Sequence, residues 1–94
     1  EPLTPIIDSV YALGIPVITV DRNINSDAFT SFIGADNEEV GRLAAQYIAG
    51  HLGKKGSVLQ ITGLPSSTPA KQREKGFNRV IRTHPAIQVV TIHG

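Results

Sequence analysis

Apolar and polar positions in the first part of the chain predict a short helix followed by a buried strand. The helix spans residues 5–13, with a start at Thr4-Pro5 and with Gly14 where a helix C′ residue belongs. Its apolar stripe is Ile6, Ile7, Val10, Tyr11 and Leu13. Residues 16–20 are then continuously apolar or β-branched, which predicts a strand that is buried on both faces.

A polar, turn-rich loop at residues 23–31 separates this strand from a short apolar run at 32–34. The loop has no helical pattern, and a parallel crossover usually takes about a dozen residues or more. The apolar run is therefore either a second strand reached by an extended return or a segment that leaves the sheet.

The rest of the chain predicts two further helices, each followed by a strand. Asp36 with Glu38 and Glu39 behind it is typical of a helix N-terminus, and the helical spacing continues to Gly53. The expected apolar stripe of this helix is Val40, Leu43, Ala44, Tyr47, Ile48 and Leu52. A strand over 57–61 comes next, then a helix from Thr68-Pro69 that buries Phe77, Val80 and Ile81, and a final strand over 87–92.

This order of elements predicts the fold class. Strands that alternate with helices indicate an α/β fold, in which a parallel sheet has helices on its faces. Gly41 and Gly50 interrupt the long helix, and each costs it about 1 kcal/mol relative to alanine. Close packing of the helix on the sheet would explain either glycine.

Composition and charge narrow the classes of function. The 94 residues are 40% hydrophobic and 18% charged, as in one small globular domain at most. A net charge of +1 gives no indication of binding to nucleic acid or an anionic membrane, and without cysteine there is no disulfide framework or thiolate metal site. No apolar run approaches the roughly 20 residues that span a bilayer. The chain begins at Glu1 without a signal-peptide pattern, so we expect a mature or excised piece.

The residues best suited to binding stand at the end of the first predicted strand. Ligands of open α/β sheets gather beyond the carboxyl ends of parallel strands, and Asp21 and Arg22 occupy that place. A carboxylate that only accepts hydrogen bonds, beside a guanidinium that only donates them, suits a neutral polyol such as a sugar. The alternative is a surface ion pair worth under about 1 kcal/mol.

A second candidate site is the loop at 63–68 with the helix that follows it, which carries Lys71 and Arg73. A loop entering a helix N-terminus can bind an anion, but the glycine-rich phosphate signature is missing here. Basic residues at such positions more often form a solvated helix face. The three histidines lack metal-ligand spacing, and the chain shows no nucleophile elbow or acid–base carboxylate pair. We therefore expect no catalytic residue, no metal site and no cofactor.

The order and spacing of three segments resemble those of a known family. The segments are IPVITVDR at 15–22, IGADN at 33–37 and STPAKQREKGF at 67–77. They are similar to the ribose-binding-protein-like periplasmic sugar-binding proteins, whose fold is shared by the effector domains of lactose-repressor-type regulators. The first five residues also look like the sugar-sensing periplasmic domains of bacterial hybrid two-component sensors. The resemblance covers nearly the whole chain.

The resemblance implies a fold of two doubly wound lobes that close on a sugar about a hinge. The chain resembles only the middle of that fold. Residues 1–35 would be the end of the first lobe and the crossover strand, and residues 36–94 would be the beginning of the second lobe. Asp21, Arg22 and Arg73 match positions that hydrogen-bond the sugar in this family.

The implied function is binding of a monosaccharide or related small polyol for ABC-type uptake or sensing in the periplasm. The partners would be the sugar and, in the complete protein, a membrane permease or sensor kinase, with no direct nucleic acid contact in this piece. The alternatives are the cytoplasmic effector-binding domain of a lactose-repressor-type regulator and, from another class, a small α/β enzyme. Because both lobes would be incomplete, with open sheet edges, we expect the isolated chain to self-associate or to be weakly stable.

Overall fold

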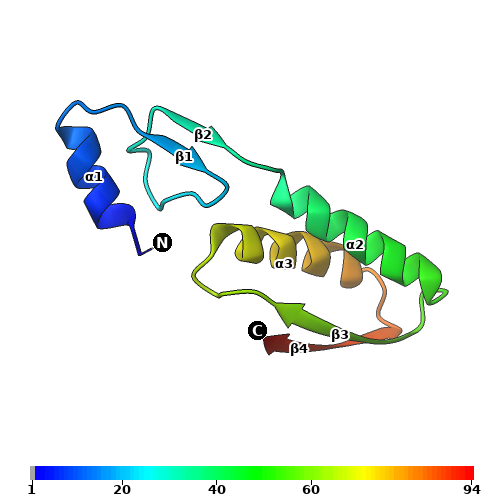
Figure 1. Cartoon of the computed structure of the whole chain (residues 1–94). Coiled ribbons are helices and arrows are strands. Elements are labelled where there is room, and N and C mark those ends of the chain that lie inside the picture. Colours follow the sequence, from blue (N-terminus) through cyan, green and yellow to red (C-terminus); the bar gives the residue numbers. More distant parts are fainter. Residues whose placement is uncertain (1) are drawn as a thin grey trace.

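The computed structural model describes residues 2–94 and contains two parallel strand pairs with helices beside them (Figure 1). In chain order the elements are α1 (Thr4–Ala12), β1 (Ile18–Val20), β2 (Ser31–Ile33), α2 (Asn37–His51), β3 (Gly56–Thr62), α3 (Thr68–Ile81) and β4 (Ile87–His93). Strand β1 pairs with β2, and β3 pairs with β4. The predicted α/β class with parallel strands and flanking helices is confirmed. None of the described helices is both long and apolar enough to cross a membrane.

The first strand pair forms although no helix lies between β1 and β2. Thr30 closes the intervening loop, because its backbone N–H donates to the carbonyl oxygen of Val17 over 2.7 Å. Its hydroxyl oxygen accepts a hydrogen bond from the backbone N–H of Val17 over 3.0 Å. Of the two predicted alternatives, the apolar run at 32–34 is therefore the strand reached by an extended return.

Strand β1 is buried on one face only, so the prediction of burial on both faces was wrong. Thr19 is buried and lines a hollow together with Ile7 of α1. Ile18 and Val20, which point to the opposite face because side chains alternate along a strand, are 62% and 65% exposed. A continuous apolar pattern predicts two covered faces, but no described element covers the second one.

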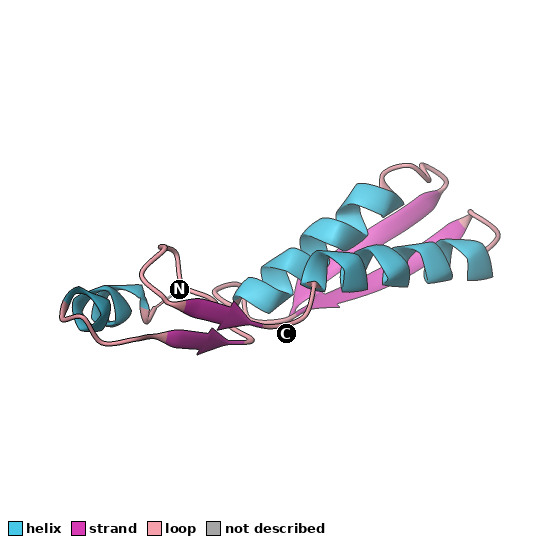
Figure 2. Ribbon diagram, turned by 90° about the horizontal axis from the view of Figure 1, so that it is seen from above, coloured by secondary structure: helices cyan, strands magenta, loops and turns pink. Residues whose placement is uncertain are grey.

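Helices α2 and α3 lie together on one face of the β3–β4 pair (Figures 1 and 2). The core between them consists of Ala49, Ile81 and Ile87, with Ile48, Val58, Phe77 and Val89 packed around it. The opposite face of the pair carries Leu59 beside Val90 and Ile61 beside Ile92 in the parallel register. These four side chains are 47% to 65% exposed. The two strands therefore have a covered face and an open apolar face.

Helix α2 starts as predicted but buries a different side. The carboxylate of Asp36 caps it by accepting a hydrogen bond from the backbone N–H of Glu39 over 3.2 Å. The buried positions are Asn37, Gly41, Ala45 and Ala49, whereas Val40, Leu43 and Tyr47 of the predicted stripe are 46% to 75% exposed. The correction has a steric cause: small residues at a spacing of four allow α3 to approach closely, and large side chains would hold it away.

Two glycines mark the points where the backbones of α2 and α3 touch. A Cβ atom on Gly41 would lie 1.9 Å from the carbonyl oxygen of Arg73, and one on Gly76 would lie 1.9 Å from the carbonyl oxygen of Glu38. The prediction that Gly41 packs closely on the sheet was wrong, because the close contact of Gly41 is with helix α3. A Cβ on Gly50 would meet nothing within 4 Å, so close packing does not explain Gly50.

We still expect the isolated chain to self-associate, because the apolar face of β3 and β4 is exposed. Sedimentation of the 94-residue chain at increasing concentration should show a rising average mass. A monomer at every concentration, with a sharp unfolding transition, would contradict it.

Gly41 and Gly50 form a matched pair for a stability test. We expect Gly41→Ala to destabilise the protein by about 1–3 kcal/mol, because the new methyl group forces the two helices apart. Gly50→Ala should instead stabilise it by up to about 1 kcal/mol, because alanine favours the helix and no atom stands in its way. Denaturant unfolding measures both changes, and equal effects of the two substitutions would refute the close helix contact.

Candidate functional site

Two segments that are distant in the sequence meet around one hollow of about 230 Å³. One is the end of β1, and the other is the loop after β3 together with the first turns of α3, which follow it directly. The lining residues of the hollow are Asp21, Arg22, Gly63, Leu64, Ser67, Pro69, Ala70 and Arg73. The structure thus brings together all three predicted site residues, Asp21, Arg22 and Arg73. Part of the second candidate loop joins them, whereas Lys71 is exposed and does not line the hollow.

Asp21 directly follows strand β1 and has an unusual backbone conformation. Its φ angle is +64°, in the left-handed region that few residues other than glycine adopt, although aspartate is among those that tolerate it. Its backbone N–H donates to the carbonyl oxygen of Ile33 over 2.7 Å, and the N–H of Arg22 donates to the carbonyl oxygen of Val20 over 2.7 Å. The chain therefore turns sharply at the point where the carboxylate and the guanidinium enter the hollow. Such backbone strain clusters at functional sites.

A polar contact joins the strand end to the start of α3. The hydroxyl of Thr68, the first residue of α3, donates to the backbone carbonyl of Asn23 over 3.4 Å. The loop before the helix is closed by the N–H of Ser67, which donates to the carbonyl of Leu64 over 2.9 Å. These bonds place the N-terminal turns of α3 opposite the end of β1.

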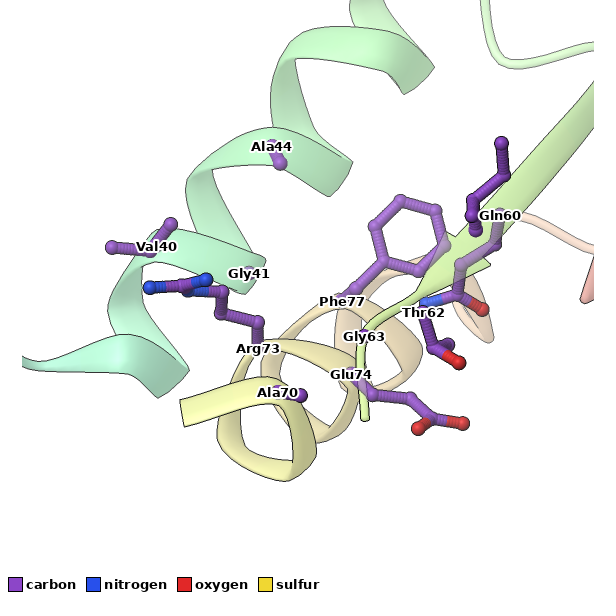
Figure 3. A pocket seen from close by; sticks show the side chains of 11 residues that line it. Val40, Gly41, Ala44, Gln60, Thr62, Gly63, Ala70, Arg73, Glu74 and Phe77 are labelled. Atoms are coloured by element: carbon purple, nitrogen blue, oxygen red, sulfur yellow. The ribbon is translucent and has the colours of Figure 1, made fainter. Parts of the chain in front are cut away.

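Arg73 is held by a residue that sequence reasoning missed. Its Nε donates to the side-chain oxygen of Asn37 over 2.9 Å, and Figure 3 shows Arg73 reaching from α3 towards the first turns of α2. Asn37 is only 2% exposed, and its side-chain amide donates to the carbonyl of Ala35 over 3.3 Å. The sequence signals at Asn37 are its place directly behind the helix cap and at the end of the IGADN segment, and neither predicts a contact with Arg73.

Arg73 also borders a second hollow, of about 250 Å³, between α2, α3 and β3. Phe77 lies beside this hollow one helical turn further along α3 (Figure 3), as expected for residues four apart on a helix. Phe77 also packs against the core, so it fixes the helix that carries Arg73.

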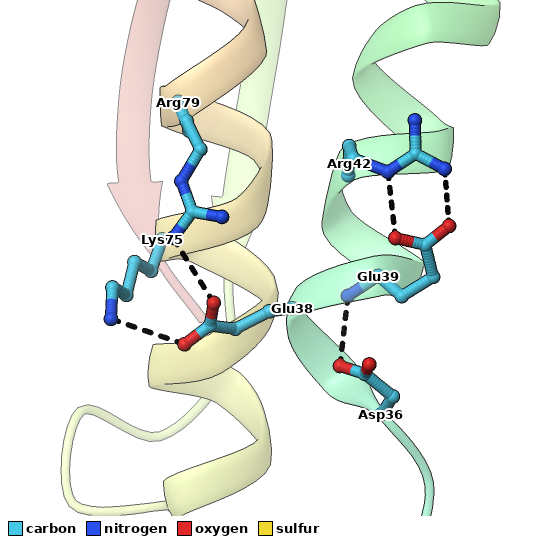
Figure 4. Close-up of polar contacts among 6 residues, drawn as sticks. All are labelled: Asp36, Glu38, Glu39, Arg42, Lys75 and Arg79. Carbon is cyan, nitrogen blue, oxygen red and sulfur yellow. Dashed lines mark hydrogen bonds and ion pairs between the residues drawn. The ribbon is translucent and has the colours of Figure 1, made fainter.

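Ion pairs link the same two helices (Figure 4). Glu38 of α2 accepts from Lys75 and from Arg79 of α3, each over 3.1 Å. The hydrogen bond from Lys75 lowers the pKa of Glu38 below its usual value of 4.5; partial desolvation opposes this, and the charges of Lys75 and Arg79 add to it. Within α2, the hydrogen bond from Arg42 lowers the pKa of Glu39 in the same way. The described residues include no cluster of three or more His, Cys, Asp or Glu that could hold a metal ion.

A family model described as a periplasmic binding protein domain matches residues 1–94 of the chain. The chain belongs to the periplasmic binding protein family. The predicted resemblance is thereby confirmed, and the observed strand pairs and helices form part of the fold of this family.

Individual members of the family show the same relationship. A ribose import binding protein of Bacillus subtilis is 33% identical over 85 residues, which are 90% of this chain and 27% of the relative. The fructose-binding periplasmic domain of a hybrid two-component system is 47% identical with a TM-score of 0.95, covering 99% of this chain and 31% of that one. The periplasmic binding protein component of an arabinose ABC transporter from Shewanella is 30% identical with a TM-score of 0.88, covering 98% and 32%. The chain thus spans about a third or less of these binding proteins.

The Glu38 ion pairs of this binding-protein segment predict a pH dependence. Because the pKa of Glu38 is lowered on folding, its contribution to stability is present above pH 4.5 and is lost as the pH falls through the lowered value. We therefore expect Glu38→Gln to reduce the free energy of unfolding at neutral pH, and the difference from wild type to shrink below pH 4.5.

Urea unfolding at a series of pH values measures this difference. Added salt serves as the control, because it screens exposed ion pairs and should reduce the difference at neutral pH. A difference that is constant from neutral to acid pH would show that the ion pairs contribute nothing.

Proposed function

We propose that this chain is part of a periplasmic solute-binding protein that binds a monosaccharide or related small polyol without catalysis. The observation that carries the proposal is the arrangement of Asp21, Arg22 and Arg73 around one hollow. The carboxylate can accept hydrogen bonds from neighbouring sugar hydroxyls, and the guanidinium groups can donate to sugar oxygens.

The proposal includes a division into two lobes. Residues 1–35 would close the first lobe and provide the crossover strand, and residues 36–94 would begin the second lobe. The separate strand pairs support this division, as do the residues 34–36 between β2 and α2, which belong to neither a strand nor a helix. The open apolar faces of both pairs fit a larger protein in which further elements cover them, and this chain covers only 31% of the fructose-binding domain.

The names of the relatives support a periplasmic location and two kinds of partner. The relatives include a ribose import binding protein, a component of an arabinose ABC transporter and a domain of a hybrid two-component system. In the complete protein, a membrane permease or a sensor kinase would read the sugar-bound state. These relatives favour uptake or sensing over the alternative of a repressor effector domain.

Calorimetric titration of the complete protein with D-fructose, D-ribose and L-arabinose tests the proposal. Saturable binding of at least one sugar, recovered chemically unchanged, is the expected result. Chemical conversion of a bound sugar would contradict binding without catalysis. Absence of a binding heat and of a melting shift with all three sugars would count against a monosaccharide ligand.

Asp21→Asn tests the role of the carboxylate. The substitution preserves the shape but replaces one acceptor oxygen with a donor group, and hydrogen bonds to charged groups are worth about 1.5–3 kcal/mol. We expect sugar affinity to fall by roughly ten- to a hundredfold while the protein stays folded. Asp27→Asn is the matched control, because Asp27 is exposed in the loop before β2 and does not line the hollow. Unchanged affinity in Asp21→Asn would favour the alternative interpretation, in which Asp21 only forms a surface ion pair.

Arg73→Ala tests closure of the two lobes. Asp21 and Arg22 belong to the proposed first lobe and Arg73 to the second, so a sugar touching all three favours the closed state. Arg73→Ala should lower affinity about tenfold or more and reduce the sugar-induced decrease in radius of gyration, measured by small-angle scattering at matched occupancy. Lys71→Ala, two residues away but outside the hollow, should behave as wild type. Equal compaction in wild type and Arg73→Ala would remove Arg73 from the site.

A further inference from the structure

Asn37 is a buried polar side chain whose two polar groups both have a partner. Among the described residues it is the largest side chain that is fully buried. Its oxygen accepts from Nε of Arg73, on the neighbouring helix, and its amide donates to Ala35, in the segment between β2 and α2. One side chain thus connects the arginine of the hollow to the segment that joins the two strand pairs.

The bond to Nε leaves the other donors of Arg73 for a ligand. A guanidinium has five N–H donors in a fixed planar fork, and Asn37 takes the one on Nε. Fixing Nε sets the plane in which the outer four N–H groups lie. Arg73 is exposed and lines the hollow with Asp21 and Arg22, so an exposed side chain gains a defined direction from a buried one.

We propose that Asn37 is a positioning residue that orients Arg73 for ligand binding. It also links Arg73 to the segment between β2 and α2, through its hydrogen bond to Ala35. This inference rests on the proposed function, because it assigns Asn37 to the same site. A long side chain held in its bound direction before the ligand arrives loses less freedom on binding. Asn37 acts only through Arg73, since Asn37 is buried and does not line the hollow.

A purely structural role would have different consequences. Asn37 is the first residue of α2, so its removal could weaken the start of that helix without involving Arg73. In that case its effect on affinity would multiply with the effect of Arg73→Ala. If Asn37 acts through Arg73, its removal has no further effect once Arg73 is gone.

A sugar-independent experiment decides whether Arg73 is held. In nitrogen-15 NMR spectra of the complete protein, the Nε–H signal of Arg73, assigned with Arg73→Lys, should exchange with water at least tenfold more slowly than that of Arg82, an exposed arginine on the far end of α3. Asn37→Ala should remove this protection. Asn37→Asp, which keeps an acceptor oxygen, should preserve it, and Asn78→Ala is the matched control on α3. Equal exchange of Arg73 and Arg82 in wild type would overturn the proposal without any variant.

The second measurement is a double-mutant cycle with D-fructose and D-ribose as probes. For whichever of the two sugars the wild type binds more tightly, Asn37→Ala should weaken binding about three- to tenfold. Asn37→Asp should keep most of the wild-type affinity. In the Arg73→Ala background, Asn37→Ala should change affinity by less than about twofold. A further three- to tenfold loss in that background would overturn positioning through Arg73. If wild type binds neither sugar, the proposed function fails for these sugars, and the exchange of the Arg73 Nε–H still decides the role of Asn37.

Discussion

The backbone contact between α2 and α3 is the constraint on which the layer over β3 and β4 and the candidate site both depend. Gly41 and Gly76 lack the side-chain atoms that would collide with the carbonyl oxygens of Arg73 and Glu38. The helices can therefore approach until their backbones touch, and polar side chains from one reach partners on the other. The bonds of Arg73 to Asn37 and of Glu38 to Lys75 and Arg79 follow from this approach.

The same contact explains how an exposed arginine is held in one direction at the candidate site. Arg73 lines the hollow beside Asp21 and Arg22, and a long, solvated side chain would normally sample several directions there. The hydrogen bond to the buried side chain of Asn37 restricts Arg73, while Phe77 holds helix α3 on the core. The opposite wall of the hollow is set by the sharp turn at Asp21, where the backbone takes a left-handed conformation.

The burial pattern shows that both strand pairs have one face that no described element covers. The β3–β4 pair is covered by two helices on one face and open on the other, and β1 has its larger apolar side chains, Ile18 and Val20, exposed. An open apolar face of this kind is unusual in a stable monomer. It agrees with a chain that spans only about a third of the periplasmic binding proteins it resembles.

Local signals in the sequence determined the element types and the candidate residues. The cap at Asp36, the proline after Thr68 and the alternation in β3 each act over a few residues, so the order of helices and strands could be predicted from them. The position of Asp21 and Arg22 directly behind a strand likewise predicted a candidate ligand site, and the structure places both residues around one hollow. The local pattern offered Arg73 only together with Lys71, as part of a second candidate site, and the resemblance to a family singled out Arg73.

Only the tertiary structure decided which faces are covered and which side chains meet. The large apolar stripe of α2 predicted burial at Val40, Leu43 and Tyr47, but burial depends on the neighbouring helix, and α3 packs on the small residues Gly41, Ala45 and Ala49. The pairing of β2 with β1 and the bond from Arg73 to Asn37 join residues far apart in the chain. Periodicity and capping carry no information about such long-range contacts, which arise only when whole elements are placed against one another.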